Sequence, residues 1–150
     1  MSEDDDRAAA QWSEALRWFA YVDQDLQAAE LCAAAEPLLL GPGAYHCQQA
    51  AEKLIKGLLV AAATRFPKIH DIKSLAHRAA ADYPELADAM MALADLTVWG
   101  LAYRYPAEEE DISDTPTVGR VCEAIAQLQS LKTIAMALGP KNEPDRDGGE

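Results

Sequence analysis

The stretch Gly43–Val60, GAYHCQQAAEKLIKGLLV, decides the fold that we expect for this chain. On a helix of 3.6 residues per turn its apolar side chains gather on one side. That side holds Ala44, Cys47, Ala51, Leu54, Ile55, Leu58 and Leu59. The opposite side carries a polar stripe of His46, Gln49, Lys53 and Lys56. The pattern predicts a central helix with one face in the core and one basic face that bears a histidine.

Two further features of this region add to the prediction. Gly41-Pro42-Gly43 reads as a turn that ends the preceding segment and lets the helix begin. Gln48 falls within the apolar sector, and a buried amide without partners would cost about 1–3 kcal/mol. We therefore expect Gln48 to bond the backbone of a neighbouring helix.

The composition favours a single all-helical domain. The chain has 150 residues, half of them hydrophobic, and it shows no alternating stretch of strand length. Its formal net charge of −12 repels polyanions, so we expect neither nonspecific DNA binding nor attraction to anionic membranes. No apolar run approaches the roughly 18–20 residues of a membrane span, and the acidic start is no secretory signal.

The cysteines indicate the compartment. Cys32, Cys47 and Cys122 lie far apart, without the spacing of metal ligands. Such thiols are typical of the reduced core of a cytoplasmic protein, and we expect no metal and no cofactor.

Start and stop signals place four more helices around the central one. We expect them at Gln11–Ala35, Ile72–Ala81, Glu85–Trp99 and from Asp114-Thr115-Pro116 to Leu138. Residues 1–8 are expected to form a mobile acidic leader, 9–139 the domain, and 140–150 a disordered tail. The prediction is an up-and-down bundle of four to five helices. Its core should include Leu54, Leu58, Leu93, Ile125 and Leu128.

The first helix is expected to have one face in the core and one in solvent. We expect Trp12, Leu16, Phe19, Leu26 and Ala33 to point into the core. By the same periodicity, Asp25 should face solvent.

The polar stripe admits two interpretations. His46, Lys53 and Lys56 supply the hydrogen-bond donors that hold a phosphate. In the alternative interpretation they form an ordinary solvated helix face, on which Glu52 and Lys56 pair at i,i+4.

Three further positions carry candidate chemistry. His70 next to Asp71 is a possible general base, although Asp71 also suits the N-cap of the following helix. Arg104 could bind a phosphate while Tyr105 stacks on a base, or it could bond helix carbonyls. His77 should be a surface residue.

Four segments occur in a fixed order between Gln11 and Leu138: WFAYVDQDLQAAEL, YHCQQAAEKLIKGLLV, KIHDIKSL and RYP. Taken together, they resemble the HEPN family, helical domains named for nucleotide binding in higher eukaryotes and prokaryotes. The resemblance implies a helical bundle that forms homodimers and binds a nucleotide or an RNA end. It also implies a minimal nucleotidyltransferase as partner, in a pair of the toxin–antitoxin type.

The same resemblance supplies an alternative function. Ribonuclease members carry an arginine, four to six residues and then a histidine, a count that Arg65 and His70 match. Phe66 stands where that motif has a polar residue, so binding is our first hypothesis. A metal-independent ribonuclease, with Arg65 stabilising the phosphorane and His70 as base, is the second. A structural partner without a ligand is the third.

Overall fold

The computed structural model describes residues 2–102 and 116–141. Within these ranges the chain is all-α, without a strand, as predicted. The α-helices are α1 (Glu3–Ala34), α2 (Leu40–Ala61), α3 (Ile72–Asp82), α4 (Ala87–Met91), α5 (Thr97–Ala102) and α6 (Val118–Leu138). Two 3₁₀ turns, Pro84–Leu86 and Ala94–Leu96, flank α4.

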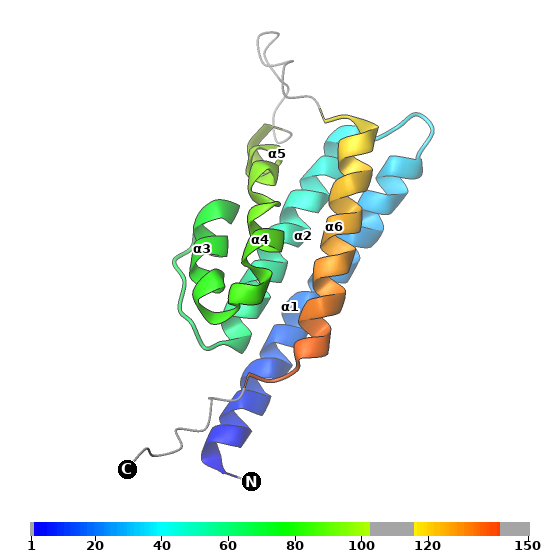
Figure 1. Cartoon of the computed structure of the whole chain (residues 1–150). Helices are drawn as coiled ribbons and strands as arrows, with labels where there is room; N and C mark the ends of the chain where they lie inside the picture. The colour runs from blue at the N-terminus through cyan, green and yellow to red at the C-terminus, as the bar shows by residue number, and fades with distance from the viewer. Residues whose placement is uncertain (1, 103–115, 142–150) are drawn as a thin grey trace.

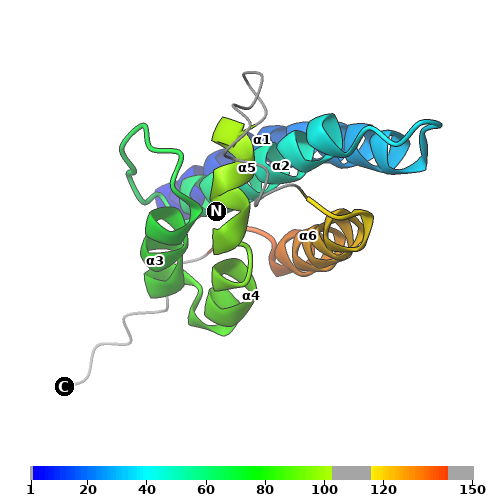
Figure 2. The ribbon, with the colours of Figure 1, turned by 90° about the horizontal axis from the view of Figure 1, so that it is seen from above.

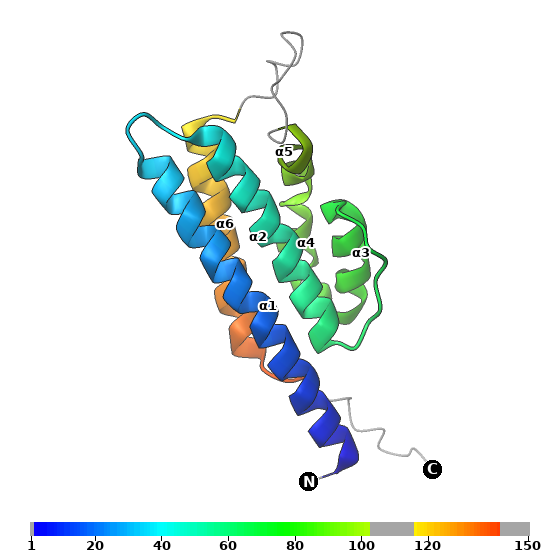
Figure 3. The same ribbon diagram turned by 180° about the vertical axis from the view of Figure 1, so that it is seen from behind.

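The helices form an up-and-down bundle with α2 at its centre. Helix α1 runs antiparallel to α2 along its whole length, and α6 packs against both (Figure 1). The shorter α3, α4 and α5 cover the other side of α2 (Figure 2). Seen from behind, the outer face of α2 lies between α1 and the α3–α5 side (Figure 3). The central position predicted for this helix is therefore confirmed.

Helix α1 begins earlier than expected. Residues 3–8, which we expected in a mobile leader, form its first turns and extend past the rest of the bundle (Figure 3). A capping box explains the early start, because the Asp5 amide donates to Ser2 Oγ and the Ser2 amide donates to Asp5 Oδ2, both at 3.2 Å. Four acidic residues in the first turn also favour the helix dipole.

The inner face of α1 follows a seven-residue repeat. One row is Trp12, Phe19, Leu26 and Ala33, all of them predicted, and the second row is Ala8, Ala15, Val22 and Ala29. Large hydrophobic side chains dominated the prediction, so the alanine-rich row was missed. As a result Leu16, predicted inside, is exposed, and Asp25, predicted outside, is buried. The burial of Asp25 matters for the candidate site described below.

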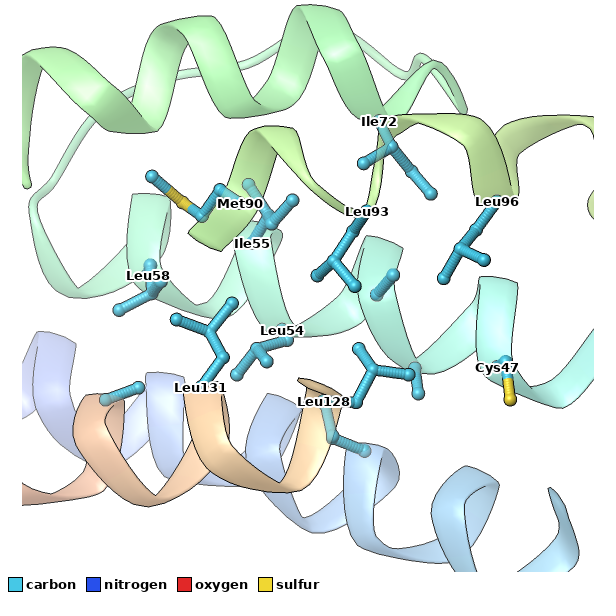
Figure 4. Close-up of a cluster of buried hydrophobic side chains, with 14 of the residues drawn as sticks. Cys47, Leu54, Ile55, Leu58, Ile72, Met90, Leu93, Leu96, Leu128 and Leu131 are labelled. Atoms are coloured by element: carbon cyan, nitrogen blue, oxygen red, sulfur yellow. The ribbon is translucent and has the colours of Figure 1, made fainter. Parts of the chain in front are cut away.

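The inner face of α2 forms the centre of the core. All seven apolar residues predicted for it are buried, and so are the five core residues named from the sequence. Figure 4 shows Leu54, Ile55 and Leu58 between side chains of the α3–α5 side and Leu128 and Leu131 of α6. At Gly57 an added Cβ would lie 2.6 Å from the Phe19 ring, so a glycine lets α1 and α2 approach closely here.

Helix α2 begins at Leu40, so Gly41-Pro42-Gly43 is its first turn rather than a separating loop. A proline fits there because amides of the first turn have no helical partner. Helix α3 begins at Ile72, as predicted, and the residues on its inner face, Ile72, Leu75, Ala76 and Ala79, are buried.

The predicted fourth helix is interrupted. Instead of one helix over Glu85–Trp99, the chain alternates between 3₁₀ turns and the short helices α4 and α5. Met90, Leu93 and Leu96 recur every third residue, a spacing that suits three residues per turn. These side chains are buried as predicted, so only the backbone path differs.

The start of α6 differs from the prediction, whereas its last residue, Leu138, agrees with it. The helix begins at Val118, after the start signal Asp114-Thr115-Pro116, and its N-cap is Thr117, whose hydroxyl accepts from the Arg120 amide. Gly139 ends the helix with φ 64°, as its position before Pro140 indicated. The expected disordered tail lies outside the described residues, apart from Pro140 and Lys141.

The three thiols have different environments. Cys47 is buried, and burial raises the pKa of its thiol to about 12. Cys32 is partly buried and Cys122 is exposed, so the prediction of three core thiols is wrong for Cys122. Within the described part of the chain, none of the helices combines the length and hydropathy that a membrane span requires.

Candidate functional site

Two buried carboxylates border the outer face of α2. Asp25 reaches it from α1, and Glu52 belongs to α2 itself. Each carboxylate holds one lysine and one histidine. We call these groups the Asp25 cluster (Asp25, His46, Lys53) and the Glu52 cluster (Glu52, Lys56, His70, Gln48). Together they contain His46, Lys53, Lys56 and His70 of the predicted site residues.

The Asp25 cluster joins the first two helices. Asp25 Oδ1 lies 3.0 Å from His46 Nδ1, and Asp25 Oδ2 accepts from Lys53 Nζ at 2.7 Å. Both partners come from the polar stripe of α2, two turns apart. About a third of the His46 side chain and a quarter of that of Lys53 remain accessible. The carboxylate therefore fixes both side chains while leaving part of each open to a ligand.

In the Glu52 cluster the carboxylate and the lysine are both buried, and only His70 is exposed. Oε1 of Glu52 lies 2.6 Å from Lys56 Nζ and 2.8 Å from His70 Nδ1, and Oε2 accepts from Gln48 Nε2 at 2.9 Å. Burial opposes ionisation of this carboxyl, but hydrogen bonds from Lys56, His70 and Gln48 outweigh it and lower the pKa of Glu52. Glu52 is therefore a carboxylate in the folded protein.

An ionised Glu52 determines the tautomer of His70. A carboxylate can only accept, so Nδ1 of His70 carries the hydrogen and donates it. In the neutral imidazole Nε2 is then a free acceptor, and 74% of the side chain is exposed. This arrangement presents a fixed, solvent-facing base at the edge of the α2 outer face.

The partner of His70 differs from the one we considered. Asp71 occupies the N-cap position of α3, but its carboxylate accepts from the Ser74 hydroxyl at 2.6 Å. That hydrogen bond is the main reason why the pKa of the Asp71 carboxyl is lowered. The carboxylate that orients His70 is Glu52, 18 residues earlier in the chain.

Gln48 links the cluster to the α5 side of the bundle. We expected it to bond the backbone of a neighbouring helix, but its recorded partners are the side chains of Glu52 and Gln49. Gly100 of α5 lies directly against it, since a Cβ added at Gly100 would be 2.8 Å from the Gln48 carboxamide carbon. The missing side chain at position 100 thus makes room for this amide.

The charges of the stripe are paired rather than free. We expected a basic patch, but Lys53 and Lys56 each face a carboxylate, so with neutral imidazoles the charges of the two clusters sum to zero. Lys56 is also buried, with 8% of the residue exposed, and does not lie on a solvated face.

The remaining candidates are only partly placed. Arg65 is exposed on the segment between α2 and α3, where its carbonyl oxygen accepts from Arg78. Arg104 and Tyr105 lie outside the described residues. His77 is exposed, as predicted. No group of three or more His, Cys, Asp or Glu side chains in residues 2–102 and 116–141 is arranged to hold a metal ion.

Sequence reasoning missed both carboxylates as parts of the site. Asp25 lies beside the heptad rows of α1, and only the alanine row would have shown that its side chain turns toward α2. Glu52 was noted only as a surface partner of Lys56, because periodicity does not show that His70 folds back over this helix.

Comparison with known families adds an independent finding. The model of the HEPN domain matches residues 15–134, which include α2, both clusters and most of the bundle. Neither the comparison with curated proteins nor that with solved structures returned a match.

Proposed function

The chain belongs to the HEPN domain family, and we propose that it binds a phosphate-bearing ligand, a nucleotide or an RNA end, on the outer face of α2. The observation that carries this proposal is the pair of carboxylate-anchored clusters, which place two ammonium groups and two imidazoles along the outer face of α2. The ligand contacts that we propose are Lys53 and His46, with Lys56 and His70 beside them.

Anchoring favours binding because it reduces the cost of ordering long side chains. A free lysine loses rotamer entropy when it binds an anion, whereas Lys53 is already held by Asp25. Its ammonium has three hydrogens, and further donors remain for a ligand oxygen. A preorganised set of donors is the feature that a phosphate site needs.

The charges of the two clusters are balanced, so a phosphate has to compete with Asp25 and Glu52 for the lysine ammonium groups. With neutral imidazoles the clusters offer a phosphate no net positive charge, in a chain of net charge −12. The attraction is therefore local, between the ligand oxygens and the two ammonium groups. Affinity should fall as salt is added, since part of this attraction is screened.

The test is calorimetric titration of the full chain with AMP. Lys53→Gln removes the charge but keeps a donor for Asp25, and should weaken binding by about 1.5–3 kcal/mol. The control is Lys73→Gln, which makes the same replacement at an exposed lysine of α3. This variant should bind AMP like the wild type. Equal affinities of the Lys53→Gln variant and the wild type would reject the α2 face as the phosphate site.

For the biological setting we propose a cytoplasmic homodimer that acts with a minimal nucleotidyltransferase, in a pair of the toxin–antitoxin type. Family membership supports this setting, and the exposed Leu16 on α1 offers apolar surface for a partner. Co-expression with the product of a neighbouring nucleotidyltransferase gene should give a stable complex. Sedimentation should give a dimer, and a monomer at every concentration would contradict the homodimer.

A second function, metal-independent ribonuclease, is favoured by the contact of Glu52 with His70. In that reaction Nε2 of His70 removes the proton of a 2′-hydroxyl, whose oxygen attacks the adjacent phosphorus. The P–O5′ bond breaks, and the 5′-oxygen leaves as a hydroxyl with a proton from water. Arg65 would stabilise the charge that develops on the phosphorane. Glu52 would orient the imidazole and stabilise its protonated form.

Incubation of RNA with the protein and EDTA separates the two functions. A binding module leaves the RNA intact, whereas a ribonuclease cuts it and leaves 2′,3′-cyclic phosphate ends. In the second case His70→Ala should abolish cleavage. His77→Ala, at an exposed histidine of α3, is the matched control and should cut like the wild type.

A further inference from the structure

A small pocket lies on the outer side of α1. It has a volume of about 200 Å³ and is lined by Glu14, Arg17, Trp18 and Tyr21. These residues follow the helical spacing of one face, and the next position of that face is Asp25. The pocket is therefore a continuation of the Asp25 cluster along α1.

Two aromatic rings give the pocket its character. Tyr21 is 57% exposed. Trp18 packs edge-to-face against Phe66, with 6.5 Å between ring centroids and an interplanar angle of 76°. Aromatic side chains that are fixed yet accessible are suited to stack on nucleobases, because every base presents a π-face. Glu14 and Arg17, an exposed ion pair at 3.3 Å, place an acceptor and donors at the rim.

The aromatic side chains also contact the lysines of both clusters. Lys53 Nζ lies 5.7 Å from the centroid of the Tyr21 ring, and Lys56 Nζ lies 5.9 Å from that of Phe66. A stacking surface and phosphate-binding ammonium groups thus adjoin each other. The volume is below the roughly 300–1,000 Å³ of a pocket for a whole drug-sized ligand, so it suits one ring system.

We propose that this pocket is a nucleobase subsite, in which Trp18 and Tyr21 stack on the base of the nucleotide whose phosphate contacts Lys53. The inference rests on the proposed phosphate site and extends it across α1. It assigns a role in ligand binding to α1, a helix on which no site residue was predicted.

The test compares AMP with ribose 5-phosphate, which has the same sugar and phosphate but no base, by calorimetric titration of the full chain. Stacking on the two rings should make AMP bind roughly 5- to 150-fold more tightly. Tyr21→Ala leaves only Trp18 to stack and should reduce this ratio several-fold, and Tyr21→Phe should preserve most of it. Because Tyr21 is exposed, neither change should disturb the core. Leu31→Ala, at an exposed residue farther along α1, is the control and should keep the ratio.

The outcomes separate this inference from the phosphate site. If both ligands bind equally in the wild type and Lys53→Gln weakens both, the phosphate site stands and the base subsite is rejected. A preference for AMP that Tyr21→Ala leaves unchanged places the base elsewhere and also rejects the subsite. If neither ligand binds, the phosphate site fails and this inference fails with it.

Discussion

The two faces of α2 are built from the same eighteen-residue stretch, but one packs apolar side chains and the other carries ionisable ones. The inner face buries seven apolar side chains, as Figure 4 shows for Leu54, Ile55 and Leu58. The outer face sits between α1 and the α3–α5 side and carries ionisable groups, two of which, Glu52 and Lys56, are buried as well. Burial alone therefore does not distinguish the core from the candidate site.

The difference lies in what each face contributes to the free energy of folding. Burying a leucine stabilises the fold by about 1.5–3 kcal/mol. A buried ion pair loses its hydration, so its net contribution is small even though loss of one partner is costly. The ionisable residues of the outer face therefore depend on one another, and together they add little to the free energy of folding.

The largest effect should come from the inner face. Leu58→Ala removes a fully buried side chain from the centre of the core and should lower the free energy of unfolding by about 2–5 kcal/mol. Urea denaturation followed by circular dichroism measures the change. Val118→Ala, at an exposed residue of α6, is the control and should cost far less. Equal losses would remove the distinction between the faces.

A smaller effect should come from the Glu52 cluster. Glu52→Gln leaves the Lys56 ammonium without a carboxylate and should cost about 1–3 kcal/mol. In a Lys56→Met background the same change should cost less, because no buried ammonium is left without its counter-charge. A double-mutant cycle in urea gives the coupling energy. A coupling near zero would show that the outer face is not interdependent.

The smallest effect should be the dependence of stability on pH. The folded-state pKa of Glu52 lies below its ordinary value of 4.5, so the associated stability is present above pH 4.5. It is lost as the pH falls further, through the folded-state pKa. Thermal unfolding between pH 5 and pH 3 should show this decline, with a shallower slope in the Glu52→Gln variant. The same slope in both proteins would assign the decline to other carboxyls.

The sequence predicted the fold far better than the site, and the reason is physical. Burial of Leu54 or Leu93 follows from periodicity within one helix, which can be read locally. The partner of His70 is Glu52, and that contact depends on how the segment between α2 and α3 folds back. Asp25 was assigned to solvent because alanines marked the second core row of α1. Long-range contacts and rows of small residues leave little trace in hydrophobic patterning.

The close fit of Gly100 against Gln48 constrains which mutations the protein can accept. An alanine at position 100 would push against the amide that donates to Glu52, and so disturb a carboxylate on another helix. A shorter side chain at position 48 would open the space but lose that donor. Positions 48 and 100 should therefore tolerate exchange together more readily than singly. In a mutational library they would appear as an epistatic pair, although Gly100 has no side chain of its own.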